Sequence, residues 1–339
     1  MKTALIITTI NDINRNILKF SNYCKIKKWD LIIIGDKKSP KNYKLKYGKF
    51  FSLKEQKKLN FNYSKICSEN SYTRKNIGYL IALKKMNEVL IETDDDNFPT
   101  NKFFQKRKKI SFVKEILNKD WVNIYDFFLK KKTNIWPRGL PLEKIKLNEI
   151  KISKKRNKGN FVLQQGLADN NPDVDAIYRL MNENIRIKFI DNKRINIGRA
   201  ITPTNSQNTT WFKQISMLMY LPATCSMRAT DIYRGYITGN ILNKLNLKTL
   251  FHSPNLIQNR NVHDLFNDYQ QELPIYQNST KILKMLQKLN FSKEKNDLAK
   301  CLIKSYKVMI KLKLINKTEL KFLNAWIKDI NNITVSNSS

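Results

Sequence analysis

Residues 89–97 read VLIETDDDN, an apolar run that ends in three consecutive aspartates, Asp94, Asp95 and Asp96. A short apolar run that passes directly into polar residues is typical of a buried strand. In a domain of alternating strands and helices, ligands bind beyond the carboxyl ends of the strands. This stretch therefore predicts an α/β domain and also the position of its functional site.

The three aspartates have the chemistry of a divalent cation site. Side chains alternate along a strand, so Asp94 and Asp96 are expected on one side and Asp95 on the other. Two carboxylates about 6–7 Å apart suit Mg²⁺ or Mn²⁺, which also takes oxygens from a diphosphate. An acidic turn that caps a helix is the other interpretation, but the position directly after a strand favours the cation site.

The residues before the acidic strand repeat the same alternation. Two apolar runs, Ala4 to Ile10 and Asp30 to Asp36, predict parallel strands joined by a helix whose cap is Asn11 or Asp12. Near-helical spacing of apolar residues predicts another helix in residues 68–86. We therefore expect a doubly wound, mostly parallel sheet.

Polar side chains fall at the ends of these predicted strands. Four of these side chains lie at the ends of the first two strands and are placed to face a base and a ribose. Two basic side chains lie in the helix before the acidic strand and are placed to meet a diphosphate. The six residues are Thr8, Thr9, Asn11, Asp36, Arg74 and Lys75. Each alone is more often a surface residue, so the prediction depends on their convergence with the aspartates in one cleft.

The composition bears on the partners of the chain. The 339 residues carry a net charge of +35, which by itself suggests a polyanionic partner or peripheral contact with an anionic membrane. Only 12 of the 63 basic residues are Arg, the residue favoured for contacts with phosphates and base edges, so recognition of nucleic acid is not favoured. The lysine-rich stretches after Lys102 and Lys154 are interpreted as exposed, solvated insertions.

The cysteine and histidine content and the hydropathy of the chain exclude several kinds of metal site and a membrane-spanning segment. The four cysteines form no C-x-x-C pair, so a zinc ribbon or an iron–sulfur site is not expected. Only His252 and His263 are present, which excludes a His-rich metal centre. No apolar run approaches the roughly 18–20 residues of a membrane span, and we expect a cytoplasmic protein.

The chain is expected to divide into three parts. A catalytic domain covers residues 1–275, and a helical appendage of two or three helices covers residues 276–332, which contain neither Gly nor Pro. Residues 333–339 are expected to form a disordered tail.

Six ordered motifs carry a resemblance to a known family. They are SYTRKNIGYLIALKKM, IETDDDNFP, WPRGLPLE, QQGLADNNPDVDAIYRL, LPATCSMRATDIYRGYI and IQNRNVHDLFNDYQQE. In this arrangement the chain resembles the STELLO family of glycosyltransferases, and it is more distantly similar to the reversibly glycosylated polypeptides and UDP-arabinopyranose mutases. The resemblance runs from Met1 to about Leu273 and does not include the C-terminal helices.

This resemblance implies a GT-A nucleotide-diphospho-sugar transferase fold, in which Asp94, Asp95 and Asp96 stand where these families carry metal-binding acids. His263, followed by Asp264, matches the last motif and is the implied third metal ligand.

Further residues take roles from the same resemblance. Asp173 and Asp175 match an acidic segment expected to bind sugar or acceptor. Asp231, Arg234 and Gly235 match a late motif that often supplies a catalytic base or a ligand for sugar hydroxyls.

The expected function is a metal-dependent transfer of a sugar from a nucleotide diphosphate donor, a UDP-sugar, to a glycan or lipid-linked acceptor. One alternative is a catalytically silent scaffold for polysaccharide synthesis with the same fold. Another is a basic protein that binds nucleic acid or an anionic surface. A mutase or self-glycosylating activity at Arg138 is a minor alternative, because the sequence after WPRG diverges from the mutase-like relatives.

Overall fold

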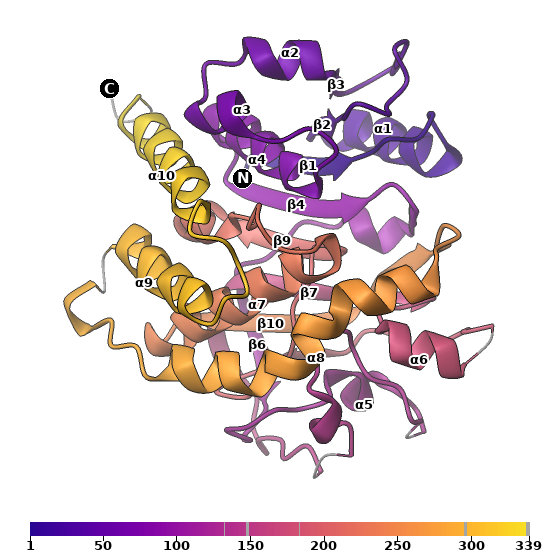
Figure 1. Ribbon diagram of the computed structural model, residues 1–339. Coiled ribbons are helices and arrows are strands. Elements are labelled where there is room, and N and C mark those ends of the chain that lie inside the picture. The colour runs from indigo at the N-terminus through magenta and orange to yellow at the C-terminus, as the bar shows by residue number, and fades with distance from the viewer. Residues whose placement is uncertain (132, 147–148, 183, 295–296, 337–339) are drawn as a thin grey trace.

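The acidic strand β4 lies inside a ten-stranded sheet, between a parallel and a mixed half (Figure 1). The structure is a computed structural model, and it describes residues 1–131, 133–146, 149–182, 184–294 and 297–336. The order of the strands is β3-β2-β1-β4-β9-β7-β6-β8-β10-β5, and β7 also pairs with β10. The strands are β1 (Thr3–Thr8), β2 (Asp30–Ile34), β3 (Lys49–Phe51), β4 (Val89–Asp94), β5 (Asn97–Pro99), β6 (Ile110–Glu115), β7 (Asn157–Asn170), β8 (Arg194–Asn196), β9 (Asn208–Phe212) and β10 (Lys248–Gln258).

Helices cover both faces of the sheet and extend beyond it. The α-helices are α1 (Arg15–Lys27), α2 (Leu53–Lys58), α3 (Asn62–Ile66), α4 (Lys75–Lys84), α5 (Ile124–Phe128), α6 (Ala176–Met181), α7 (Met227–Lys244), α8 (Leu265–Gln287), α9 (Leu298–Lys311) and α10 (Glu319–Ser336). The 3₁₀ helices are η1 (Tyr72–Arg74), η2 (Asn101–Phe104), η3 (Leu142–Lys144), η4 (Lys213–Met219) and η5 (Ser292–Glu294). The prediction of an α/β fold with C-terminal helices is confirmed.

The first half of the sheet has the predicted parallel arrangement. Strand β1 pairs in parallel with β2 and β4, and β2 pairs in parallel with β3. Leu5 and Ile7 of β1 pack in the core cluster that contains α1, whereas Ala4 and Ile6 pack in the cluster that contains α4. Alternate side chains of one strand therefore face helices on opposite sides, as a doubly wound sheet requires.

Two local predictions in this half need correction. The N-cap of α1 is Asn14, whose side chain accepts a hydrogen bond from the amide of Ile17, and not Asn11 or Asp12. Strand β1 ends at Thr8, two residues earlier than expected, because Thr9 and Asn11 turn toward the acidic segment and donate hydrogen bonds to Asp95. Those turn residues therefore face the site and do not extend the sheet.

The prediction of a mostly parallel sheet is wrong for the second half. Strand β9 is antiparallel to both β4 and β7, β6 is antiparallel to β7, and β10 is antiparallel to β5 and β8. Among the described residues of this half, only the strand pairs β7–β10 and β6–β8 are parallel. An apolar run indicates that a strand is buried but carries no information on its direction, which depends on connections that were not predicted.

The C-terminal helices pack tightly on the rest of the chain. Asp329 of α10 accepts hydrogen bonds from the amides of Asn62 and Tyr63 at 2.8 Å each. Trp326 is fully buried beside Tyr79 of α4, and Figure 1 shows α10 alongside α3 and α4. The expected boundary at residues 275 and 276 falls inside helix α8. Helices α9 and α10 share one core cluster with the sheet.

The prediction of a disordered tail is wrong for residues 333–336. These residues continue helix α10, because Ile333 is buried in the core cluster and holds the last turn in place. The rest of the predicted tail, 337–339, lies outside the described residues.

Two glycines of α7 have opposite surroundings and give a testable contrast. A Cβ at Gly239 would have no atom within 4 Å, and Gly239 lines a second cavity of about 260 Å³. Alanine loses less conformational freedom than glycine when it enters a helix. We expect Gly239→Ala to raise the free energy of unfolding by about 0.5–1 kcal/mol, measured by urea denaturation.

Gly235 is the matched control. A Cβ there would lie 2.4 Å from the carbonyl oxygen of Thr204, so the backbone would have to move. We expect Gly235→Ala to lower the free energy of unfolding by about 1–3 kcal/mol. Equal effects of the two substitutions would contradict this description of how α7 packs.

Candidate functional site

One cleft of about 850 Å³ opens at the carboxyl ends of the parallel strands. Thr8, Asp36, Arg74 and Asp96 all line it, although they are far apart in the sequence. This is the convergence that their positions at neighbouring strand ends predict. Residues at the start of α7 and in the segment after β10 line the other side of the cleft.

Asp94 forms the end of β4 and is fixed by a buried cation. The ammonium of Lys75, which is fully buried, donates to Oδ1 of Asp94 at 2.8 Å, and the hydroxyl of Tyr72 donates to the same oxygen at 3.0 Å. The side-chain hydrogen bonds that the described residues make to the Asp94 carboxylate all go to Oδ1. Lys75 and Tyr72 therefore fix the orientation of the Asp94 carboxylate through Oδ1, and its other oxygen, Oδ2, remains available to a ligand.

Asp95 connects the acidic turn to the end of β1. Its Oδ2 accepts hydrogen bonds from the hydroxyl of Thr9 and from the side-chain amide of Asn11. Its carbonyl oxygen accepts from the side chains of Asn14 and Asn16 at 2.9 Å each. Burial raises the pKa of the Asp95 carboxyl above its ordinary value.

The expected alternation of the three aspartates ends with the strand. Because β4 stops at Asp94, Asp95 and Asp96 belong to a turn, and all three acids line the cleft. Asp96 accepts a hydrogen bond from the side-chain amide of Gln258 at 3.0 Å. Burial, followed by the nearby charge of Asp94, raises the pKa of Asp96 to about 6. Accumulated negative charge of this kind is relieved by a bound cation.

Asp36 shapes the first side of the cleft. Its two carboxylate oxygens accept hydrogen bonds from the amides of Asn70 and Ser71, at 2.9 and 2.8 Å. Arg74 lines the cleft but is almost fully buried, and its guanidinium donates to Gln56 and to the carbonyl oxygens of Cys67 and Ser68. Arg74 therefore has a structural role, because its hydrogen bonds connect the segments that form this side of the cleft.

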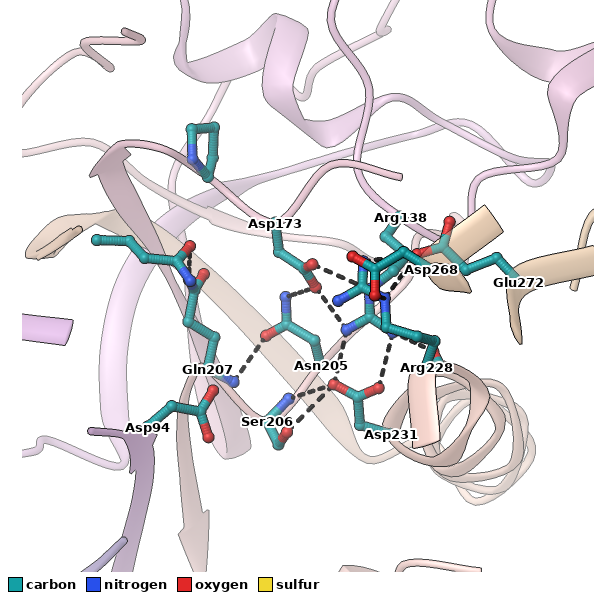
Figure 2. A network of polar contacts seen from close by, with 12 residues as sticks. Asp94, Arg138, Asp173, Asn205, Ser206, Gln207, Arg228, Asp231, Asp268 and Glu272 are labelled. Carbon is teal, nitrogen blue, oxygen red and sulfur yellow. Dashed lines mark hydrogen bonds and ion pairs between the residues drawn. The ribbon is translucent and has the colours of Figure 1, made fainter. Parts of the chain in front are cut away.

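The opposite wall is built around Arg138, as Figure 2 shows. Its guanidinium donates to both oxygens of Asp173 at 2.9 Å and to both oxygens of Asp231 at 3.0 Å. All three side chains are buried at the edge of the cleft. Arg138 holds the pKa of Asp231 down at about 2 although burial opposes this, so Asp231 stays ionised.

The segment 205–207 joins the two walls and was not identified from the sequence. Ser206 donates to Asp231 through its backbone amide and its hydroxyl, and its hydroxyl also shares a hydrogen bond with Tyr72. In Figure 2, Ser206 and Gln207 lie between Asp94 and Asp231. The sequence offers only the polar run after Pro203 as a signal, and such runs are common in ordinary loops.

Arginines and acids continue this wall beyond Arg138. Arg228 pairs with Glu272, and Arg260 pairs with Asp268 at 2.6 Å. His263 lines the cleft, but its Nδ1 lies 3.3 Å from a carboxylate oxygen of Asp268. The structure thus gives His263 a carboxylate partner on its own side of the cleft.

Several predicted site residues lie away from the cleft. Lys75, Asp175 and Arg234 are not among the described residues that line it. The Lys75 ammonium donates to Asp94, to the hydroxyl of Tyr72 and to the carbonyl oxygen of Thr93. Asp175 is the N-cap of α6 and accepts a hydrogen bond from the indole of Trp136 at 2.6 Å. Burial raises its pKa to about 6.

The other predicted site residues of the late motifs have structural roles, which their contacts show. Arg234 forms a buried ion pair with Glu92 at 2.7 Å. Gly235 permits the close approach of Thr204, and Asp264 is the N-cap of α8. Only Asp231 of the motif TDIYRGY faces the cleft.

The acidic turn offers fewer ligands than a complete protein metal site. Within the described ranges, no three His, Cys, Asp or Glu side chains are grouped so that they could hold a metal ion. Mg²⁺ is commonly bound by one or two carboxylates together with substrate phosphates and water. Asp94 and Asp96, both lining the cleft, meet that smaller requirement.

No helix in the part of the chain that the structure describes combines the length and the apolar content needed to cross a bilayer.

Comparisons with known proteins relate the chain to one family. The family model described as STELLO glycosyltransferases matches residues 228–339. Two proteins of Arabidopsis thaliana, named probable glycosyltransferase STELLO2 and STELLO1, are 26% and 25% identical to the chain over 326 residues. Each alignment covers 90% of this chain and 42% of the relative, so the chain spans less than half the length of these proteins.

The extent of the match corrects one prediction. The resemblance was expected to end near Leu273, but the family match continues to residue 339 and includes the C-terminal helices. The helical segment is therefore part of what the chain shares with these proteins.

Proposed function

Because the chain is related to the STELLO glycosyltransferases, we propose that it transfers a sugar from a nucleotide diphosphate donor, a UDP-sugar, to a glycan or lipid-linked acceptor. The observation that carries this proposal is the acidic turn, which opens into one cleft with the carboxyl ends of β1 and β2. The cleft lies where α/β folds bind nucleotides. The same features support a GT-A-type arrangement.

On the donor side, we assign the metal to Asp94 and Asp96. A bound Mn²⁺ or Mg²⁺ would neutralise the charge that develops on the departing nucleoside diphosphate. Lys75 and Tyr72 fix the orientation of Asp94, so that little reorganisation is needed when the donor binds. Thr8, Asn11 and Asp36 line the cleft at the strand ends that would receive the base and the ribose.

On the acceptor side, we assign Asp231 to the orientation of a sugar hydroxyl. Asp231 lines the cleft, but its clamp by Arg138 keeps its pKa at about 2 and makes it a weak proton acceptor. An ionised carboxylate is nevertheless a strong acceptor of hydrogen bonds from hydroxyl groups. Asp173, held by the same arginine, supports this wall.

A thermal-shift screen tests the proposed donor site. UDP-sugars with Mn²⁺ are expected to raise the melting temperature, because a ligand that binds only the folded chain stabilises it by mass action. At a ligand concentration of about 100 times Kd the gain is about 2.7 kcal/mol. Adenosine diphosphate and Mn²⁺ alone are the matched controls. The absence of a shift with every nucleotide sugar would remove the donor site.

The scaffold alternative differs from the transferase in turnover and not in binding. A donor that binds with Mn²⁺ but is never consumed with any acceptor glycan would favour the scaffold. Release of UDP from the bound donor supports the transferase.

A further inference from the structure

The two lysine-rich stretches of the sequence become neighbours in the structure, although about 45 residues separate them. Strand β6 pairs antiparallel with the first residues of β7, so that Phe112 lies opposite Lys158 and Ile110 lies opposite Asn160. The Ile116–Ile152 bridge continues this pairing. One ladder therefore gathers residues 106–117 and 151–160.

One face of this ladder is turned to solvent. Along β6, Ile110, Phe112 and Lys114 are exposed, whereas Ser111 and Val113 are buried. Directly opposite residues of an antiparallel pair share a face, which adds Lys158 and Asn160. The exposed fractions of Phe112 and Ile110 are 65% and 54%, which is high for apolar side chains that lie side by side. We call these five residues the ladder face.

Positive charge surrounds the ladder face. Seven exposed cations lie in residues 106–117 and 154–158, and no ion pair with a carboxylate is found for any of them within the described residues. They are Lys106, Lys108, Lys114, Lys154, Lys155, Arg156 and Lys158. Charges that are neither paired nor buried are free to attract a large anionic partner.

We infer that the ladder face binds the surface of an anionic lipid bilayer, with Phe112 and Ile110 entering the headgroup region and the lysines contacting anionic headgroups. Apolar side chains flanked by Lys and Arg are typical of surfaces that lie in this interface. A single-stranded nucleic acid would need several aromatic rings on which its bases stack, whereas Phe112 is the one aromatic residue of the ladder face. Arg156 is the one arginine among the seven cations.

The position of the ladder face keeps this binding separate from the proposed function. The ladder occupies the first residues of β7, while Asn170 at the other end donates to the carbonyl oxygen of Gln258, which lines the cleft. Ten residues of strand span about 33 Å. The cleft therefore remains accessible when the ladder face is on a membrane, and the two proposals can fail independently.

Flotation of the chain with lipid vesicles tests the inference. The chain is expected to float with vesicles of phosphatidylcholine and phosphatidylglycerol and not with phosphatidylcholine alone, and added salt should weaken the binding. Phe112→Ser should reduce the partition coefficient roughly tenfold. Each of Lys114→Gln and Lys158→Gln should reduce it about fivefold.

Phe266→Ser is the matched control, because Phe266 is exposed to 64% but lies at the start of α8 beside acidic residues. It should bind vesicles like the wild type. Melting curves of all variants check folding, and the lysine variants provide a second test should Phe112→Ser not fold. The inference is overturned if the wild type does not float with anionic vesicles or if the folded ladder variants float as well as the wild type. Tighter binding of an RNA oligonucleotide than of the vesicles would also overturn it.

Discussion

Asp96→Ala is expected to weaken the binding of UDP in the presence of Mn²⁺ by roughly tenfold or more. The substitution removes one of the two carboxylates assigned to the cation, so the charge of the diphosphate is less well compensated in the cleft. The fold should be retained, because the partly buried Asp96 carboxyl lies close to Asp94 and its removal relieves repulsion in the metal-free chain. Titration calorimetry with UDP and Mn²⁺ measures the effect.

Asp191→Ala is the control for this prediction. Asp191 is exposed, pairs with Lys102 and does not belong to the cleft. Its loss should leave the affinity for UDP unchanged. An Asp96→Ala variant with the affinity of the wild type would remove Asp96 from the metal site.

Arg234→Leu is expected to lower the free energy of unfolding by about 3–5 kcal/mol. Arg234 is paired with Glu92, which is fully buried, and its guanidinium lies over the ring of Trp211. Without Arg234, Glu92 keeps a buried charge with no cation beside it, and that penalty is the main cost. Urea denaturation measures the change.

Two variants separate the loss of this ion pair from a general effect of removing an arginine. Arg199→Leu changes an exposed arginine and should stay within about 0.5 kcal/mol of the wild type. Glu92→Gln in the Arg234→Leu background should recover part of the stability. A fully stable Arg234→Leu variant that lost only activity would return Arg234 to the catalytic role first expected for it.

The side of the cleft that contains the acidic turn could be predicted from the sequence because it depends on local patterns. An apolar strand followed by acids, and polar residues after two more strands, suffice to place Asp94, Asp36 and Thr8 together. Parallel neighbours end at the same edge of a sheet, so the convergence follows from the strand assignments alone.

The opposite wall could not be predicted in this way. Arg138 meets Asp173 and Asp231 across 35 and 93 residues of chain, and no local pattern specifies such contacts. Asp231 and Arg234 lie three residues apart on α7, yet Asp231 faces the cleft while Arg234 faces the core. Helical spacing indicates neighbouring faces, but the packing of α7 decides which one meets the ligand.

The lysine-rich stretches show a similar limit. Each alone is a solvated segment, and the antiparallel pairing of β6 with β7 creates a surface that neither has by itself. Register between distant strands is decided by tertiary structure, so the ladder face is visible only in the fold.

The most direct test of the proposed metal-dependent donor site is a calorimetric titration of UDP into the wild-type chain, once with Mn²⁺ and once with EDTA. Binding is expected with Mn²⁺, and the affinity should be at least roughly tenfold lower with EDTA, because without the cation nothing beside Asp94 and Asp96 compensates the negative charge of the diphosphate. Equal affinity in the two solutions, or no binding in either, would contradict the proposed metal-dependent donor site.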